Sequence, residues 1–317
     1  MAIRFDEALL EMGKDIAGLY NAVPEADRLQ AQEIRLRSGS PPSITDSNGI
    51  SISYGSRNVS VYEIESAFVS LCGHSVYSHT EELKNGYLTV KGGHRAGFGC
   101  RAVYDNDGLL SIREISSINL RIAREIIGCS NQLAEKLFYD GLCGVLIVGA
   151  PSSGKTTILR DIARYISESG SKVTICDERG EIAAVCDGVS QFRLGRCCDV
   201  LTGFSKAQAV LRAVRCLSPR AVVCDEIGND EEADTLCDAL NAGVEVIASV
   251  HAANEKEFLC RTQCLKMLMT GAFEKVVFLP RSYKDKEQIK IMKAGDLIEN
   301  CSSCADSYMR MPNRYGA

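Results

Sequence analysis

The sequence predicts two domains, a small α+β domain followed by an α/β domain with a mostly parallel sheet. At 317 residues the chain is long enough for two domains. From residue 126 onwards, short apolar runs alternate with helical patterns, which is typical of a parallel sheet covered by helices on both faces. Before that point, strand-like stretches and short helices are separated by turn residues. We therefore expect an N-terminal domain with linker at residues 1–125 and a second domain at 126–317.

In the N-terminal part, apolar residues at helical spacing predict one helix from about residue 5 to 19, ending near Pro24. Ser60 and Glu63 have the spacing of a capping box, which predicts that a second helix begins there. The other expected elements are a strand at 34–37, a hairpin of 44 with 50–52, a short helix around 81–84, and strands from 87 to 122 with breaks at 92–93 and 105–108.

In the second part, apolar runs and helical patterns alternate. Ser205 and Gln208 have capping-box spacing, which predicts the start of one of the helices, and residues between 177 and 204 are expected to form a loop. The expected strands are at 145–148, 172–176, 221–224, 244–250 and 275–279. Five helices are expected in this part. The first covers residues 131–139, the second runs from the end of the 149–156 loop to residue 167, and the third begins at Ser205. The fourth follows residue 226 and ends at Leu240, and the fifth follows residue 251.

Residues 149–156, with the sequence GAPSSGKT, match the pattern G-x-x-x-x-G-K-[ST] between an apolar strand and a helix. Glycines let backbone N–H groups close around phosphate oxygens, and the helix N-terminus adds a positive dipole. Lys155 should reach the β- and γ-phosphates, and the Thr156 hydroxyl should bind Mg²⁺. The alternative is a chance glycine loop, which the flanking strand and helix argue against. The predicted nucleotide-binding residues are Gly149, Ala150, Pro151, Ser152, Ser153, Gly154, Lys155, Thr156 and Thr157.

Two acids, Asp225 and Glu226, follow four apolar residues of a predicted buried strand. In a protein with a phosphate-binding loop this is the Walker B arrangement, in which Asp225 holds Mg²⁺ together with Thr156 and Glu226 orients or deprotonates the attacking water. The alternative interpretation is that the two acids cap a helix after a core strand, which would give the same sequence pattern. An adjacent glutamate is typical of ATP hydrolases, whereas nucleotide kinases need an acceptor pocket. The predicted ligands are therefore ATP and Mg²⁺.

Further candidate residues follow two other strands. Asp177, Glu178 and Glu181 come after the strand at 172–176, and we expect their carboxylates to point toward the γ-phosphate side, since strand carboxyl ends line the ligand crevice in such sheets. A solvated loop would look similar. His251 follows the strand at 244–250, where a γ-phosphate sensor would lie, although a lone histidine is more often an ordinary core or surface residue.

Composition limits the partners. The net charge of −5 is spread evenly over both parts of the chain, so nothing favours a nucleic-acid partner. No apolar run approaches the ~20 residues that span a bilayer, so membrane association is expected only through a partner. The 15 cysteines are scattered, several lie within apolar runs, and no signal-peptide pattern precedes them, which predicts a cytosolic protein with reduced thiols. Cys301 and Cys304 are interpreted as part of a tail without metal.

The ordered set of motifs resembles the type II/IV secretion ATPase superfamily of hexameric RecA-like motors, and within it the sporulation ATPases. The residues that carry the resemblance lie at 33–37, 91–97, 118–125, 149–156, 177–181, 215–219, 225–228 and 250–252. The resemblance implies a RecA-like second domain and a ring of two-domain subunits, with ATP between the domains and arginines completing the site. Arg121 and Arg124 are the first candidates, with Arg113, Arg196 and Arg215 behind them.

The resemblance further implies a Mg²⁺-dependent ATPase that forms a ring of identical subunits, expected to be a hexamer, and that powers or assembles a membrane-spanning secretion-like channel between mother cell and forespore. Such a protein would lie on the cytoplasmic, mother-cell side and bind membrane proteins of the complex. Two alternatives remain open at the level of sequence. One is a nucleic-acid-dependent RecA-like ATPase, and the other is a scaffold that is gated by nucleotide without productive turnover.

Overall fold

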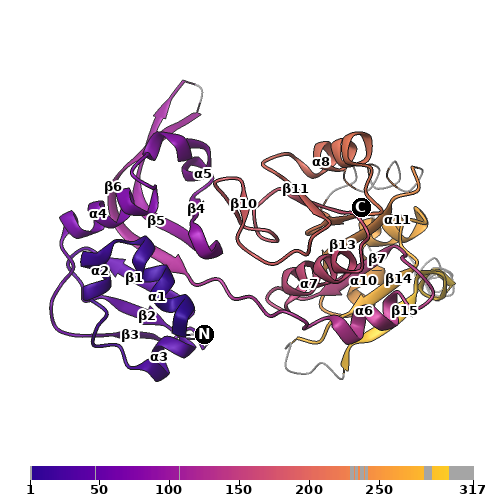
Figure 1. Cartoon of the computed structure of the whole chain (residues 1–317), viewed down its shortest axis with the longest axis horizontal. Helices are drawn as coiled ribbons and strands as arrows, with labels where there is room; N and C mark the ends of the chain where they lie inside the picture. The colour runs from indigo at the N-terminus through magenta and orange to yellow at the C-terminus, as the bar shows by residue number, and fades with distance from the viewer. Residues whose placement is uncertain are drawn as a thin grey trace, which may run out of the picture. The chain divides into compact units, whose positions relative to one another are not determined.

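The computed structural model describes residues 2–46, 48–106, 108–228, 242–281 and 288–299, together with Glu232, Thr235 and Ala239 (Figure 1). The chain forms two compact units. The first contains Met1–Glu125 and Ala184–Phe192, and the second contains Ile126–Ala183 and Arg193–Ala317. The chain therefore passes from one unit to the other three times.

The first unit is an antiparallel sheet with helices on one face. The sheet has six strands in the order β3-β2-β1-β6-β5-β4. The strands are β1 (Glu33–Arg37), β2 (Ser43–Thr45), β3 (Ser51–Ser53), β4 (Tyr87–Thr89), β5 (Arg95–Asp105) and β6 (Gly108–Arg121). The helices are α1 (Ala2–Glu11), α2 (Lys14–Gly18), α3 (Glu25–Gln30), α4 (Val61–Leu71) and α5 (Thr80–Lys84), with 3₁₀ turns η1 (Val76–His79) and η2 (Lys91–Gly93).

The local patterns of this unit are largely confirmed. Ser60 accepts a hydrogen bond from the backbone of Glu63 while the Glu63 side chain accepts from the backbone of Ser60, so the capping box opens α4. One prediction is wrong: the single helix expected over residues 5–19 is divided into α1 and α2. Gly13 lies between them with a φ of 100°, a conformation that glycine adopts without strain and that interrupts a helix.

The second unit has a seven-stranded sheet in the order β11-β8-β12-β13-β7-β14-β15. All neighbours are parallel except β14 and β15, so the predicted mostly parallel sheet is confirmed. The strands are β7 (Val145–Gly149), β8 (Val173–Asp177), β11 (Cys198–Thr202), β12 (Ala221–Cys224), β13 (Glu245–His251), β14 (Lys275–Phe278) and β15 (Lys290–Lys293). The helices whose two ends lie among the described residues are α6 (Asn131–Leu137), α7 (Lys155–Glu168), α8 (Lys206–Arg212), α10 (Glu255–Cys260) and α11 (Thr262–Met269), with a π-helical turn at Ala213–Leu217.

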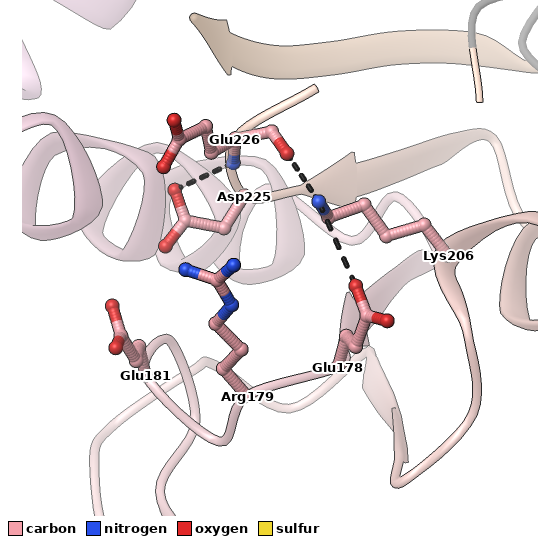
Figure 2. A pocket seen from close by; sticks show the side chains of 6 residues that line it. All are labelled: Glu178, Arg179, Glu181, Lys206, Asp225 and Glu226. Carbon is pink, nitrogen blue, oxygen red and sulfur yellow. Dashed lines mark hydrogen bonds and ion pairs between the residues drawn. The ribbon is translucent and has the colours of Figure 1, made fainter. Parts of the chain in front are cut away.

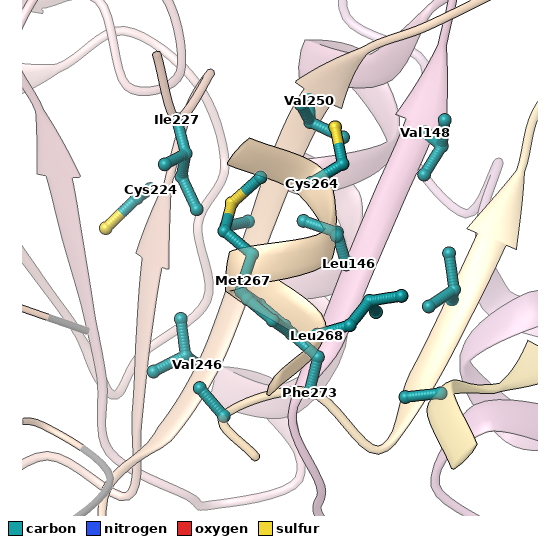
Figure 3. Close-up of a cluster of buried hydrophobic side chains, with 14 of the residues drawn as sticks. Leu146, Val148, Cys224, Ile227, Val246, Val250, Cys264, Met267, Leu268 and Phe273 are labelled. Carbon is teal, nitrogen blue, oxygen red and sulfur yellow. The ribbon is translucent and has the colours of Figure 1, made fainter. Parts of the chain in front are cut away.

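Helices cover both faces of this sheet. Side chains of α8, α10 and α11 pack on one face against alternate residues of the central strands, and Figure 3 shows Met267 and Leu268 of α11 near Leu146 and Val246. Helix α7 contacts β7, β8 and β13. Strand pairing aligns Cys224 with Cys176 and His251 with Gly149. As a result, the carboxyl ends of β7, β8, β12 and β13 meet at one edge of the sheet.

Several elements of the second half differ from the sequence predictions. Strands β11 and β15 were not expected, because both lie at the sheet edges and are partly exposed, so they lack the apolar run of a buried strand. The one helix expected after residue 251 is two, separated at Arg261, whose φ and ψ of −91° and 117° are extended. The helix expected through Leu240 lies mostly outside the described residues, and Cys301 and Cys304 lie wholly outside them.

A short hairpin interrupts the loop that was expected between residues 177 and 204. Its strands, β9 (Val185–Cys186) and β10 (Val189–Ser190), belong to the first unit. There, the backbone N–H of Gly92 donates to Gln191 Oε1 at 2.9 Å. A Cβ at Gly93 would lie 2.9 Å from the Phe192 ring, so a side chain at that position would push the hairpin away. The segment that follows the acids at 177–181 is thus anchored on turn η2.

Candidate nucleotide-binding site

The loop at 149–156 joins β7 to α7 with the geometry of a phosphate cradle. Gly154 has a φ of 93° directly before α7, and a Cβ at Gly149 would lie 2.4 Å from Ser153 Oγ. The first N–H groups of α7 have no partners within the helix, which makes this terminus a site for anions. Ser153 Oγ is buried and makes no hydrogen bond to any described residue. A phosphate oxygen bound in the cradle could supply the hydrogen-bond partner that Ser153 Oγ lacks.

Lys155 lies across the cradle, buried, with its ammonium directed at three acceptors. Nζ donates to the carbonyls of Gly149 at 3.1 Å and Ala150 at 3.0 Å and contacts His251 Nδ1 at 2.8 Å. Burial lowers the pKa of Lys155, against the opposing effect of Glu226 and Asp225. Because an ammonium can only donate, Nδ1 of His251 is the acceptor. The ring proton is then on Nε2, which donates to Glu226 Oε2 at 3.0 Å. Hydrogen bonds therefore run from Lys155 through His251 to Glu226.

Asp225 is held by hydroxyl groups from two elements. Thr156 Oγ1 donates to Asp225 Oδ2 at 3.1 Å, and Ser249 Oγ of β13 donates to Oδ1 at 3.0 Å. Magnesium is typically bound by one or two carboxylates together with substrate phosphates and water. No group of three or more His, Cys, Asp or Glu side chains in the described part of the chain could hold a metal by itself. Thr156 and Asp225 together fit a magnesium ion that arrives with a nucleotide.

Figure 2 shows a hollow at the same edge of the sheet, beside this pair. Its lining consists of Glu178, Arg179, Glu181, Lys206, Asp225 and Glu226. The structure thus brings Glu178 and Glu181, which follow β8, next to the two acids that follow β12. Four carboxylates and two cations share this small space. Because the carboxylates would repel a triphosphate, its approach would depend on how far cations neutralise them.

The prediction that Asp177 points toward the phosphates is wrong. The side chain is buried, and its carboxylate accepts backbone N–H groups of Glu181 at 2.9 Å, Ile182 at 3.1 Å and Ala183 at 2.8 Å. Burial raises the pKa of Asp177, which the three N–H donors partly offset. From α7, Arg160 donates to the carbonyls of Ile182 and Glu181. Asp177 therefore shapes the loop that carries Glu178 and Glu181, and of these three acids Asp177 is the one that does not line the hollow.

The candidate arginines have different environments. Arg124 donates from Nη2 to the carbonyls of Gln30 at 3.2 Å and Ala31 at 3.0 Å, so it has a structural role at the end of α3. Arg121 is exposed at the end of β6, where it pairs with Arg95 of β5 and Glu33 of β1 in the sheet register. The three remaining candidates are exposed, one in the first unit and two in the second: Arg113, Arg196 and Arg215.

Sequence reasoning missed three residues of the site. Ser249 is the one polar residue within the buried run of β13, which is a signal that could have been read. Arg179 lies between the two acids that line the hollow. Lys206 was noticed only as part of the capping box opened by Ser205, whose side chain does accept from the backbone of Gln208. Its contacts with Glu226 and Glu178 depend on the order of the strands, so no pattern in the sequence near Lys206 predicts them.

The fold is that of the RecA-like secretion ATPases. The structure is similar to that of the pilus retraction motor PilT with bound ADP, with a TM-score of 0.58 and 17% identity over 91% of this chain and 88% of that one. It is also similar to the Legionella pneumophila ATPase DotB, with a TM-score of 0.56 and 17% identity over 92% of this chain and 87% of the other.

The chain belongs to the family described as sporulation stage III, protein AA, whose model matches residues 15–294. It is 36% identical to stage III sporulation protein AA of Bacillus subtilis over 267 residues, which cover 82% of this chain and 86% of that protein. A more distant relative is the Arabidopsis thaliana protein SEEDLING PLASTID DEVELOPMENT 1, with 28% identity over 50% of this chain and 23% of that protein. Among the residues that the structure describes, no helix has the length and apolar character to cross a membrane.

Proposed function

We propose that the protein is a Mg²⁺-dependent ATPase that acts in sporulation as a ring oligomer, most simply a hexamer. Hydrolysis would power or assemble a secretion-like channel between mother cell and forespore. The observation that carries the proposal is the hydrogen-bonded line from Lys155 through His251 to Glu226, beside the pair of Thr156 and Asp225. Every residue of this set lies at one edge of one sheet, so the groups that would bind phosphate, hold Mg²⁺ and position water can act on one bound nucleotide.

Each of these side chains has a definite task in the proposed reaction. The cradle and Lys155 bind the phosphates, and Glu226, oriented by His251 Nε2–H, orients the attacking water and accepts its proton. Magnesium, when bound through Thr156 and Asp225, would neutralise charge on the phosphate oxygens. When phosphate takes over the Lys155 ammonium, His251 Nδ1 loses its donor, so the histidine is suited to report the occupied cradle to Glu226.

The other parts of the proposal rest on the family. Arginine is the usual source of the further positive charge in such sites, and Arg121 is the stronger candidate because Arg124 already binds the end of α3. The partners would be further copies of the chain and membrane proteins of the channel, with the protein held on the cytoplasmic side of the mother-cell membrane through them. A nucleic-acid partner is not proposed, since the net charge of −5 offers no basic footprint.

The test is phosphate release and nucleotide binding in the wild type and in Glu226→Gln, with particle mass measured by light scattering. We expect the wild type to hydrolyse Mg-ATP, and Glu226→Gln to bind ATP without cleaving it. Glu135→Gln, an exposed change on α6, is the matched control and should behave as the wild type. Normal hydrolysis by Glu226→Gln would refute the assignment. ATP-dependent oligomers without phosphate release would favour a scaffold, and turnover that requires DNA would favour a nucleic-acid-dependent ATPase.

A further inference from the structure

Lys206 is a cation in the lining of the hollow, and Figure 2 shows its contacts with Glu226 and Glu178. It is the first residue of α8, and its side chain is only 11% exposed. Its Nζ donates to the backbone carbonyl of Glu226 and lies 3.6 Å from Glu178 Oε2 and 3.4 Å from Glu232 Oε1. One ammonium therefore reaches the loop after β8, the acid after β12 and the segment beyond it.

The position of Lys206 is unfavourable by local criteria. A positive charge at the start of a helix opposes the helix dipole, which favours acids there and bases at the other end. Holding a long, flexible side chain in one conformation also costs entropy. Burial of the ammonium adds a desolvation cost, so the contacts with Glu226, Glu178 and Glu232 must offset all three effects. A residue that breaks local rules in this way is expected at a functional or strained site.

Lys206 contacts the segment of residues 226–228, in which each backbone N–H group donates a hydrogen bond. Glu226 N–H donates to Asp225 Oδ1 at 2.9 Å, Ile227 N–H donates to the carbonyl of Ser249 at 2.9 Å, and Gly228 N–H donates to Glu232 Oε2 at 2.7 Å. Lys206 binds the carbonyl of Glu226 at the start of this segment and also contacts Glu232, which holds its end. The ammonium thus closes the set of bonds that fixes the main chain of residues 226–228.

We infer that Lys206 is a positioning residue for Glu226. It fixes the Glu226 backbone so that the side chain stays on His251 Nε2, and its charge keeps Glu178 close to Glu226 despite their mutual repulsion. This inference rests on the proposed ATPase function of the same site. Because a displacement of about 1 Å of a catalytic group can cost roughly 100-fold in rate, loss of Lys206 should lower kcat by about 10- to 100-fold. KM for Mg-ATP should change by less than about threefold, since the phosphates are bound by the cradle.

The test compares Lys206→Met, Lys206→Gln and Lys206→Arg with the wild type, and uses Lys136→Met, an exposed change on α6, as control. Steady-state ATP hydrolysis gives kcat and KM separately. Hydrogen exchange of peptides that cover residues 224–228 in the nucleotide-free protein reports on the segment without requiring turnover. We expect Met and Gln to lower kcat and to speed exchange at 226–228, while Arg, which keeps the charge and the donor, restores most of both.

An unchanged kcat together with unchanged exchange in Lys206→Gln would overturn the inference, as would a rise in KM alone. If Lys206→Met does not fold, the contrast between Gln and Arg decides the question. If the wild type binds ATP but releases no phosphate, the proposed ATPase function is refuted, while the inference about Lys206 can still be tested. Exchange at 226–228 then still decides whether Lys206 holds the segment, because faster exchange in Gln and Met supports that role and equal exchange excludes it.

Discussion

Substitution of the buried carboxylate Asp161 should destabilise the second unit far more than substitution of Glu168, an exposed carboxylate that contacts the same arginine, Arg164. Asp161 lies on α7 and accepts hydrogen bonds from Gly128 N–H at 2.9 Å, Ser130 N–H at 2.7 Å, Ser130 Oγ at 2.8 Å and Arg164 Nε at 2.6 Å. It thereby ties the segment before α6 to the helix that begins at the phosphate cradle. Arg164 also contacts Glu168, whose side chain is 52% exposed, compared with 4% for Asp161.

The size of the effect follows from these contacts. Breaking a buried ion pair by removing one partner costs about 3–5 kcal/mol. Asparagine keeps one acceptor oxygen, so we expect Asp161→Asn to cost about 3 kcal/mol, a loss of roughly 6–12 °C in Tm for a unit of this size. Glu168→Gln removes only a solvent-exposed pair on the same arginine and should cost about 0.5 kcal/mol or less.

The assay is urea and thermal unfolding followed by far-UV circular dichroism, because the chain has no tryptophan. The effect should depend on pH. Burial would raise the pKa of Asp161, but the bonds from Arg164, Ser130 and Gly128 outweigh it and hold that pKa below the ordinary 3.8. The stabilisation is then complete at neutral pH and is lost as the pH falls from 3.8 through the lower, folded-state pKa. Equal losses for Asp161→Asn and Glu168→Gln at pH 7 would refute this reasoning.

Three further substitutions test other parts of the structure. Asp225→Asn should abolish Mg²⁺-dependent phosphate release, measured over a range of Mg²⁺ concentrations, and turnover that still responds to Mg²⁺ would exclude Asp225 as its ligand. Arg121→Ala should lower kcat by about 10³-fold or more while ATP binding, followed by calorimetry, is kept, and unchanged turnover would remove Arg121 from the site. Ser60→Ala should cost the first unit about 1 kcal/mol in urea unfolding through loss of the α4 cap, with Ser56→Ala as an exposed control that changes little.

Much of the site could be predicted from sequence because its parts are local. The cradle needs glycine at 149 and 154 within a few residues of each other, and the strand before it and the helix after it are visible as contiguous patterns. Asp225 and Glu226 are recognisable because they end a buried strand. The same holds for the capping box at Ser60, which involves residues only three positions apart. Each of these features depends on neighbours in the chain.

The sequence by itself thus determined the mostly parallel sheet, the glycine-containing loop between β7 and α7, and the acids that follow the strands. Only the tertiary structure decided which side chains meet, because that depends on the order β8-β12-β13-β7, which no local stretch encodes. That order brings His251 between Lys155 and Glu226, and it places Lys206 against the carbonyl of a residue 20 positions away. The inward position of Asp177 has a different reason, because three backbone N–H groups of its own loop offer the buried carboxylate the partners it needs.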